Sequence, residues 1–392
     1  MSRAFLIVID SVGIGGAPDA DQFFNGDVPD TGANTLGHIA QAGALNIPVM
    51  AGLGAGAALT LASGMEDHGI SGKVTGAWGA ATEVSQGKDT PSGHWELAGV
   101  PVPWDWHRFP AEEPAFPNEL SEMICSVAGT GGILGNRHDN GIAVIDKEGA
   151  RHVQTGWPIC YTSVDSVLQI AAHEEVFGLE RLLKLCDEIA PSLHAMRVGR
   201  VIARPFVGDV ERGFTRTANR KDFAIAPPAR TICDYVNAAG RDVYGVGKIG
   251  DIFSMRGISS TTKGRDAKLM DDIDALVDTA SDGSLTFANL VEFDSEYGHR
   301  RDVQGYARHL EWFDARLGAV IGRLKPDDLL IVTADHGNDP TWIGTDHTRE
   351  RVPVLVHGIG SKPLGQLNFT DVGASVAAHL GVAYAGEGTS FL

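Results

Sequence analysis

Aspartate residues recur in this sequence at points where a short apolar stretch ends. Asp10 follows "AFLIVI", Asp294 follows "LTFANLVEF", and Asp335 follows "DLLIVTA". Because the carboxyl ends of parallel strands meet at one edge of a sheet, where ligands bind, we expect these three acids to lie together. A single acid after a strand is usually a turn former or a helix cap, so only the combination favours a functional site.

Three histidines accompany these acids. "FDSEYGHRRD" contains His299, "TADHGNDP" contains His336, and "GTDHTRERVP" contains His347 just before another apolar stretch. A lone histidine is more often an ordinary surface or core residue. Three histidines with three aspartates, however, could bind two divalent first-row metal ions, which together promote phosphoryl transfer. Asp339 and Asp346 lie in the same loops, and we interpret them as turn formers or as partners of the histidine ligands.

The stretch "GKDTPSGHWE" offers a hydroxyl group for such chemistry. Pro91 is a typical first helical residue, so Thr90 is predicted to be the N-cap of a helix. Threonine is a weak nucleophile that two cations can activate, and a helix N-terminus also stabilises phosphate. Ser92, in the predicted first turn, is the alternative hydroxyl. Three further side chains are expected to pack or orient the helix: His94, Trp95 and Glu96.

The segments that would position these residues alternate between short strands and longer helical stretches. Helices are expected near residues 267–280 and 305–324, between strands rich in valine, isoleucine and leucine. This alternation predicts an α/β fold, with a mostly parallel sheet core and helices on both faces.

The middle of the chain has a different character. Proline and tryptophan cluster at residues 100–114, and a second break, "AIAPPAR", follows at residues 224–230. Between the breaks, shorter apolar runs indicate a separate α+β unit. We therefore expect a discontinuous core of residues 1–102 and 226–392 around an inserted, smaller α+β cap domain of residues 103–225.

Composition limits the class of protein. The chain has 392 residues, 43% of them hydrophobic, and a formal net charge of -18, which disfavours nucleic acid and anionic membranes as partners. Its four widely spaced cysteines contain no CxxC pair, so reduced thiols are expected. The first apolar run is too short for a signal peptide, and no run approaches the roughly 18 apolar residues of a membrane span. These features predict a cytoplasmic protein.

One stretch of this acidic chain is basic. Residues 196–222 contain seven basic and three acidic residues, a local net charge of +4. The ordinary interpretation is a solvated charged face. Arg200 and Arg204, however, lie within a strand-like apolar run, where water is less able to solvate their charges. The planar guanidinium group of arginine is suited to binding phosphate.

Together these motifs resemble the alkaline phosphatase superfamily and, within it, the phosphopentomutase family. The resemblance rests on "VIDSVGIGGAPDA", "GKDTPSGHWE", "VEFDSEYGHRRD" and "TADHGNDP...GTDHTRE", and it extends from Phe5 to the C-terminal "GTSFL". The same resemblance is found in two stretches from the middle of the chain, "YTSVDSVLQIAAHEE" and "GRVIARPFVG". It implies an isomerase that interconverts ribose 1-phosphate and ribose 5-phosphate, and the 2-deoxyribose phosphates, through a phosphothreonine enzyme and a pentose 1,5-bisphosphate.

The resemblance also implies roles for individual residues. Two manganese ions are expected, although the donor set alone does not exclude zinc, and Thr90 would be the phosphorylated residue near both ions. The ligands of the first ion would be Asp10, Asp335 and His336, and those of the second Asp294, His299 and His347. The substrate contacts would be Ser163, Asp165, Arg200, Arg204, Arg216 and Lys248. A sugar bisphosphate, glucose 1,6-bisphosphate or ribose 1,5-bisphosphate, would prime the enzyme.

The motifs are also compatible with other functions. A phosphatase or phosphodiesterase with the same metal ions would let water finish the reaction, whereas a mutase must keep water from its phosphoenzyme. A non-catalytic metal-binding or sugar-phosphate-sensing protein would show no turnover. The cofactor-independent phosphoglycerate mutases resemble the core, but a serine nucleophile and a different insertion are expected there. The expected partners are small-molecule pentose phosphates, and no obligate protein partner is implied.

Overall fold

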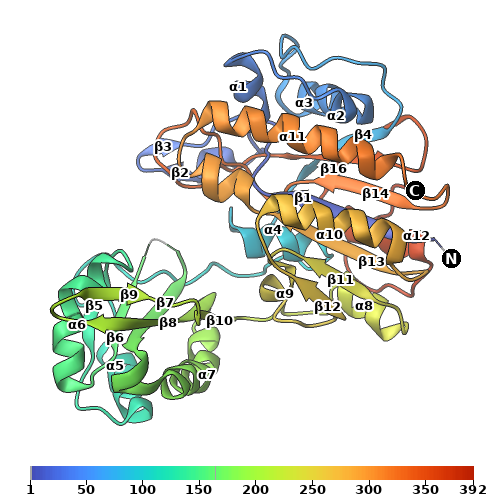
Figure 1. Cartoon of the computed structure of the whole chain (residues 1–392). Coiled ribbons are helices and arrows are strands. Elements are labelled where there is room, and N and C mark those ends of the chain that lie inside the picture. The colour runs from blue at the N-terminus through green and yellow to red at the C-terminus, as the bar shows by residue number, and fades with distance from the viewer. Residues whose placement is uncertain (1, 164) are drawn as a thin grey trace. The chain divides into compact units, whose positions relative to one another are not determined.

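The computed structural model describes residues 2–163 and 165–392, which form two compact units. The first unit consists of Met1–Pro103 and Pro227–Leu392, and the second consists of Trp104–Ala226. The divisions lie one residue beyond the boundaries expected from the sequence. In Figure 1, the blue and the orange-to-red parts of the chain belong to the first unit, so the two ends of the chain build one body.

The first unit is built on an eight-stranded sheet with the strand order β12-β11-β13-β1-β14-β15-β4-β16. Within this sheet β15 runs antiparallel to both of its neighbours, and the other strands share one direction. The predicted α/β fold with a mostly parallel sheet is therefore confirmed. The strands are β1 (Ala4–Ile9), β4 (Ala77–Thr82), β11 (Val243–Val246), β12 (Ser260–Thr262), β13 (Leu285–Leu290), β14 (Leu329–Thr333), β15 (Val352–His357) and β16 (Lys362–Asn368).

Helices cover both faces of this sheet, so that every residue of the central strands β1, β13 and β14 is buried. This explains why these strands are continuous apolar runs rather than alternating ones. One face is covered by α1 (Thr35–Gln41), α2 (Pro48–Leu53), α3 (Ala55–Ser63), α10 (Asp266–Thr279) and α11 (Val303–Ile321) (Figure 1). The other face is covered by α4 (Thr90–Leu97), α8 (Ile232–Ala238), α9 (Ile249–Ile252) and α12 (Thr370–Leu380).

The reversed direction of β15 decides which loops meet at the sheet edge. Thr333, the last residue of β14, pairs with Val354, and Val352 pairs with Ala81 near the end of β4. Since β15 is antiparallel, it begins where β1, β13, β14 and β4 end. The segment before β15 therefore reaches the same edge as the segments that follow the other four strands.

The second unit has a mixed six-stranded sheet with the order β10-β8-β7-β6-β5, and β9 pairs with β8. Helix α6 (Ala143–Thr155) packs on one face, and α5 (Asn118–Ala128) and α7 (Leu179–Ala195) pack on the other, each over its own apolar cluster. The strands are β5 (Leu134–His138), β6 (Ile159–Thr162), β7 (Val167–His173), β8 (Arg200–Asp209), β9 (Gly213–Arg216) and β10 (Lys221–Ala224).

The four cysteines form no disulfide in the structure, and Cys160, Cys186 and Cys233 are buried. Among the described residues, no helix combines the length and the apolar character that crossing a bilayer requires.

Candidate metal centre

Three buried carboxylates converge at the carboxyl edge of the core sheet. Asp10 directly follows β1, Asp335 lies just after β14, and Asp294 belongs to the π-helix η3 (Phe293–Gly298) after β13. Asp10 and Asp335 have no exposed surface, and Asp294 is 7% exposed. The acids predicted from the strand ends are thus brought together.

The histidines complete two overlapping groups of candidate ligands. In each group the ligand atoms lie within 4.8 Å of one another, and the groups are Asp10, Asp335 and His336, and Asp294, His336 and His347. His336 is common to both, and its ring stacks on that of His347 with centroids 4.0 Å apart. His299 joins the second group through Nε2, which lies 3.1 Å from Asp294 Oδ2 and 3.2 Å from His347 Nε2.

The unsatisfied oxygen atoms of two carboxylates fit a cation site. Asp10 Oδ1 and Asp335 Oδ2 are buried and accept no hydrogen bond of good geometry within the described residues, although His94 Nδ1 lies 3.1 Å from Asp335 Oδ2. Burying such an oxygen is costly unless an opposite charge compensates it. Burial and the charges of Asp335 and Asp294 raise the pKa of Asp10 well above its ordinary value. Burial also lowers the pKa of His336 to about 4, so its imidazole is neutral at pH 7, the form that binds metal ions.

The remaining carboxylate oxygens are held by neutral donors. Asn289 Nδ2 donates to Asp10 Oδ2 at 2.9 Å, and Asn338 Nδ2 donates to Asp294 Oδ1 at 2.7 Å. Such partners orient metal ligands. The sequence analysis predicts a role for neither asparagine. Asn289 could have been recognised, because it is a polar residue within the apolar run "LTFANL".

Ser11 is held in a strained backbone conformation beside these ligands. Its φ of 71° lies in the left-handed region, which costs a residue other than glycine about 1 kcal/mol or more. Its N–H donates to Asp335 Oδ1 at 3.1 Å, and its carbonyl accepts from the Asn338 N–H at 3.1 Å. The turn therefore links the loops that follow β1 and β14.

Another group of possible ligands is already satisfied by protein donors. Asp266, Glu292 and His309 lie close together, but Asp266 accepts from the backbone N–H groups of Val291 and Glu292 and faces His309 Nε2 at 2.9 Å. This network fixes the segment that enters η3, which contains Asp294. It needs no metal ion to balance its charges.

Helix α4 places the Thr90 hydroxyl against the ligand set, but the predicted N-cap is wrong by one residue. The cap is Asp89, whose Oδ1 accepts from the Ser92 N–H at 3.1 Å and whose Oδ2 accepts from Ser92 Oγ at 3.0 Å. Proline suits the second helical position as well as the first, because neither N–H has a partner within the helix. Thr90 Oγ1 is released from capping and lies 3.4 Å from His336 Nε2.

Three further residues hold α4 in position. His94 Nδ1 lies 3.1 Å from Asp335 Oδ2, so a residue expected only to orient the helix also contacts a candidate ligand. Gly93 allows this approach, because a methyl group at its Cα would lie 2.0 Å from the Asp335 carbonyl oxygen. The carboxylate of Glu96 accepts from the N–H groups of Val84 and Ser85, which fixes the loop between β4 and α4.

The two loop aspartates have separate partners. Asp339 accepts hydrogen bonds from the backbone N–H groups of Asn34 and Thr341 and from the side chain of Thr341, and it pairs with His38. These contacts are those of a turn former, one of the two roles expected for this residue. Asp346 Oδ1 accepts from the N–H of His347 at 2.8 Å.

A small hairpin, β2 (Phe24–Asn25) and β3 (Val28–Pro29), joins the Thr90 loop to the His347 loop. Lys88 Nζ donates to Asp30 Oδ2 and to the Phe24 carbonyl, both at 2.9 Å. Asn25 Nδ2 donates to the His347 carbonyl at 3.0 Å, and His347 Nδ1 donates to the Lys88 carbonyl at 2.7 Å. The Lys88–Asp30 pair is buried, so it is more than a surface ion pair.

Replacing Lys88 by methionine is expected to destabilise the fold by about 3 kcal/mol, because the Asp30 charge remains buried without its cation. Urea denaturation measures the loss. Lys268→Met is the matched control, since Lys268 pairs with Asp272 on the exposed surface of α10, and this change should cost less than about 1 kcal/mol. Equal stability of Lys88→Met and the parent protein would contradict the role of the pair.

The predicted substrate contacts are divided between the two units. Lys248 is an exposed residue that follows β11 in the first unit, and its charge partly offsets the rise in the pKa of Asp10 that burial causes. In the second unit, Arg200 Nη2 lies 3.5 Å from Asp165 Oδ2, and Arg204 Nε donates to Gln169 Oε1 at 3.0 Å. The other two contacts also lie in the second unit: Ser163, next to β6, and Arg216, the last residue of β9.

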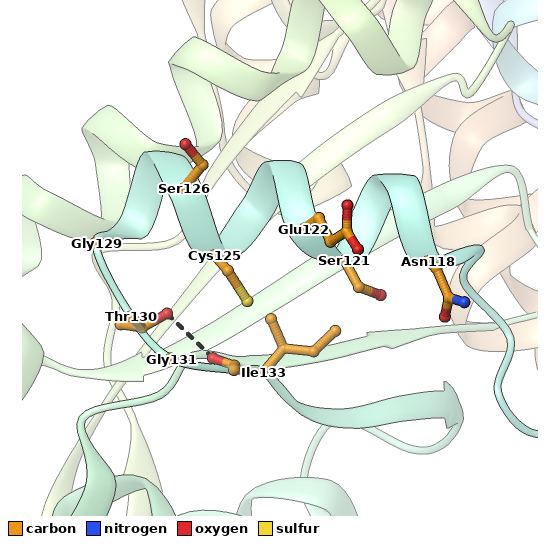
Figure 2. A pocket seen from close by; sticks show the side chains of 10 residues that line it. Asn118, Ser121, Glu122, Cys125, Ser126, Gly129, Thr130, Gly131 and Ile133 are labelled. Carbon is orange, nitrogen blue, oxygen red and sulfur yellow. Dashed lines mark hydrogen bonds between the residues drawn. The ribbon is translucent and has the colours of Figure 1, made fainter.

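Two pockets of similar size differ in charge. Figure 2 shows the first, of about 530 Å³, between α5 and the segment from Gly129 to Ile133, and its lining contains neither lysine nor arginine. The second, of about 500 Å³, is lined by Arg204, Arg216 and Arg220. Both belong to the second unit, and only the second is suited to an anionic group.

Comparison with known proteins places the whole chain among related sequences. A family model described as the metalloenzyme superfamily matches residues 2–384. The phosphopentomutase of Methylobacterium nodulans is 55% identical over 403 residues, which cover 97% of this chain and 98% of that protein. The phosphopentomutase of Methylobacterium radiotolerans is 53% identical over 412 residues, which cover 100% of both chains.

A solved structure shows a weaker likeness. The PH0037 protein from Pyrococcus horikoshii covers 98% of both chains, with 12% sequence identity and a TM-score of 0.49. This likeness adds nothing to the relationship seen in the sequences.

Proposed function

Since this chain belongs to the phosphopentomutase family of the metalloenzyme superfamily and is an isomerase, we propose that it interconverts ribose 1-phosphate and ribose 5-phosphate. We propose the same reaction for the corresponding 2-deoxyribose phosphates. The contact between Thr90 Oγ1 and His336 Nε2 at 3.4 Å supports this proposal best. It directs a hydroxyl at the group of Asp and His side chains, while Asp89 serves as the helix cap.

In the proposed cycle, Thr90 holds a phosphoryl group between two transfers. The free hydroxyl of a pentose phosphate attacks the phosphorus of phospho-Thr90. The bond from phosphorus to Thr90 Oγ1 breaks, a bond to the sugar oxygen forms, and the hydroxyl proton passes to Thr90 Oγ1. The Thr90 hydroxyl then attacks the other phosphorus of the resulting pentose 1,5-bisphosphate. The bond from that phosphorus to the sugar oxygen breaks, a bond to Thr90 Oγ1 forms, and the Thr90 proton passes to the sugar oxygen, which restores phospho-Thr90.

The proposed metal ions are two Mn²⁺. Asp10, Asp335 and His336 would hold one ion, and Asp294, His299 and His347 the other, with Thr90 close to both. The buried oxygens of Asp10 and Asp335 without hydrogen bonds support this donor set. When bound, two divalent ions favour the ionised hydroxyl and offset the charge of the transferred phosphoryl group.

Residues 103–225 are proposed as a cap that keeps water from phospho-Thr90 and grips the substrate. Ser163 and Asp165 would face the sugar hydroxyls. The phosphate that does not react would be held by Arg200, Arg204, Arg216 and Lys248. Glucose 1,6-bisphosphate or ribose 1,5-bisphosphate would phosphorylate Thr90 at the start, and we propose the cytoplasm as the site of action.

An assay of products tests this function directly. The protein with Mn²⁺ and glucose 1,6-bisphosphate should convert ribose 1-phosphate into ribose 5-phosphate without releasing phosphate. Peptide mapping by mass spectrometry should find one phosphoryl group, on Thr90. Stoichiometric free phosphate without ribose 5-phosphate would instead identify a phosphatase, and a phosphoryl group on Ser92 would contradict the assigned nucleophile.

A further inference from the structure

The second arginine of the stretch "GHRRD" has no part in the proposed function, although it lies among the ligand loops. Arg301 follows His299 by two residues and lies just before α11. Its φ of 56° lies in the left-handed region, which glycine or asparagine would adopt at less cost. The backbone therefore does not account for an arginine at this position, and the reason lies in its side chain.

The guanidinium group of Arg301 connects three segments of the chain. Nη1 donates to the Gly298 carbonyl at 2.9 Å, Nε to the Gly344 carbonyl at 2.7 Å, and Nη2 to the Asp346 carbonyl at 3.1 Å. Nη1 also donates to the side-chain oxygen of Asn338. All four acceptors are uncharged. A planar group with fixed donors holds them in a defined arrangement, which an ammonium group on a flexible stem does not.

Two of these carbonyl groups belong to residues that directly precede candidate ligands of the second ion. Gly298 precedes His299, and Asp346 precedes His347. The Nε2 atoms of the two histidines lie 3.2 Å apart. The segments that Arg301 joins are therefore the ones that bring these two rings together.

The third candidate ligand of this ion is reached through Asn338. Arginine has no acceptor atom, so the Asn338 amide can face Arg301 only with its oxygen. Its Nδ2 then faces Asp294, to whose Oδ1 it donates at 2.7 Å. Without the guanidinium group, the amide could turn and lose this hydrogen bond. Arg301 thus fixes the orientation of the amide that in turn orients Asp294.

The positive charge of Arg301 would by itself oppose a cation bound nearby, but carboxylates surround it. Burial lowers the pKa of Arg301, and the charges of Asp339, Asp294 and Asp346 counteract this effect. The side chain is half-buried, so water also screens its charge. We therefore expect the hydrogen bonds that hold the ligand segments to outweigh the repulsion of the ion.

We propose that Arg301 is the positioning residue of the second ion site. It holds the segments that carry His299 and His347 at the spacing that the ion requires. It also keeps the Asn338 amide turned toward Asp294. This role rests on the proposed function, because only the proposed ion pair gives Arg301 an ion to position. Arg301 touches neither ion and no reacting atom, so its loss should weaken one ion and leave the other.

Titration of the metal-free full chain with Mn²⁺ tests this role without turnover, and electron paramagnetic resonance of free aqueous Mn²⁺ counts the ions bound. Arg301→Ala should bind the second ion at least tenfold more weakly, the usual cost of removing a partner of a metal ligand, and bind the first ion normally. Arg301→Lys keeps the charge but not the planar fork, and it should weaken the second ion by a smaller factor. In His299→Ala, where the second ion is already lost, Arg301→Ala should change nothing further.

Arg300→Ala is the matched control. The Arg300 side chain is 64% exposed and pairs with Glu296 at 2.8 Å. Its replacement removes the same charge from the same loop without touching the three connected segments. The affinity for either ion should change less than about twofold.

Turnover separates a positioning role from a direct contact with the substrate. In Arg301→Ala, the Mn²⁺ concentration that gives half-maximal turnover should rise at least tenfold. At saturating Mn²⁺, kcat and the KM for ribose 1-phosphate should return to within about threefold of the unmodified protein, since the ion site is then filled. A KM that stays raised at saturating Mn²⁺ would instead show a substrate contact and overturn the proposal.

The remaining outcomes separate this role from the proposed mutase function. Equal weakening of both ions would show a general effect on the fold, and unchanged or tighter binding of the second ion would show that repulsion dominates. Either result overturns the role of Arg301. A single Mn²⁺ bound by the unmodified protein would overturn both the ion pair and this role. Absence of isomerisation by the unmodified protein, with the second ion still weakened in Arg301→Ala, would overturn the mutase function and leave the role of Arg301 standing.

Discussion

Replacing Thr90 by alanine is expected to abolish isomerisation, lowering kcat by roughly 10⁴-fold or more, because the group that holds the phosphoryl between its two transfers is lost. The expectation follows from the position of Thr90 Oγ1, 3.4 Å from His336 Nε2, and from the capping of α4 by Asp89. A coupled assay for ribose 5-phosphate measures turnover. Intact-protein mass spectrometry after treatment with glucose 1,6-bisphosphate measures phosphorylation, which should also disappear.

Ser92→Ala is the matched control for this experiment. It removes the other hydroxyl of the same helix, whose hydrogen bond to Asp89 serves the cap, and it should cost about 1 kcal/mol of stability while phosphorylation continues. Thr90→Ser keeps a hydroxyl and should retain measurable turnover. Undiminished turnover of Thr90→Ala, or phosphorylation lost in Ser92→Ala at unchanged folding, would refute Thr90 as the nucleophile.

Removing the metal ions is expected to have an effect of similar size. Chelation should reduce turnover to background, and added Mn²⁺ should restore it, because the proposed ions stabilise the charge of the transferred phosphoryl group. Two buried carboxylate oxygens of the ligand set have no hydrogen-bond partner and are available to such ions. Metal binding should also raise the melting temperature, since a ligand at a thousandfold excess over its Kd stabilises the fold by about 4 kcal/mol. Full turnover in protein shown to be metal-free would end this assignment.

Single substitutions then distinguish the two groups of ligands. In the proposed assignment His336 binds the first ion, so His336→Ala should lose this ion and retain the one held by Asp294, His299 and His347. His299→Ala should instead retain the ion held by Asp10 and Asp335. Metal analysis of the dialysed variants measures the stoichiometry. Asp271→Asn, which alters an exposed carboxylate paired with Arg316, is the control and should keep both ions. Full metal occupancy in His336→Ala would contradict the assignment of this histidine to the first ion.

The sequence predicts the central strands better than the edges of the sheet. β1, β13 and β14 are buried on both faces and therefore appear as apolar runs. β4, "AWGAAT", consists mostly of small residues and gives no such signal, and β16, "KPLGQLN", is a half-exposed edge strand. The apolar pattern of β15 does not predict the direction of this strand either. A run of buried residues looks the same in a sequence whether the strand is parallel or antiparallel to its neighbours.

The candidate ligands were easier to find than the residues that hold them. Several Asp and His residues rarely follow strands together unless they form a site, so this pattern can be recognised in a single sequence. The partners Asn289 and Ser11 act through one amide group and one backbone N–H, which have no distinctive spacing. The sequence predicts the helix start one residue late, because both Thr90 and Asp89 are good N-cap residues. Only the contacts of Asp89 with Ser92 decide between them.

The reversed strand β15 has a consequence for the order of events during synthesis of the protein. His347 reaches the metal-ligand edge only when β15 has inserted between β14 and β4, which lie far apart in sequence. A growing chain that already contains Asp10 and Thr90 but not yet His347 therefore lacks part of the candidate ligand set. The set is complete only when almost the whole polypeptide has been synthesised.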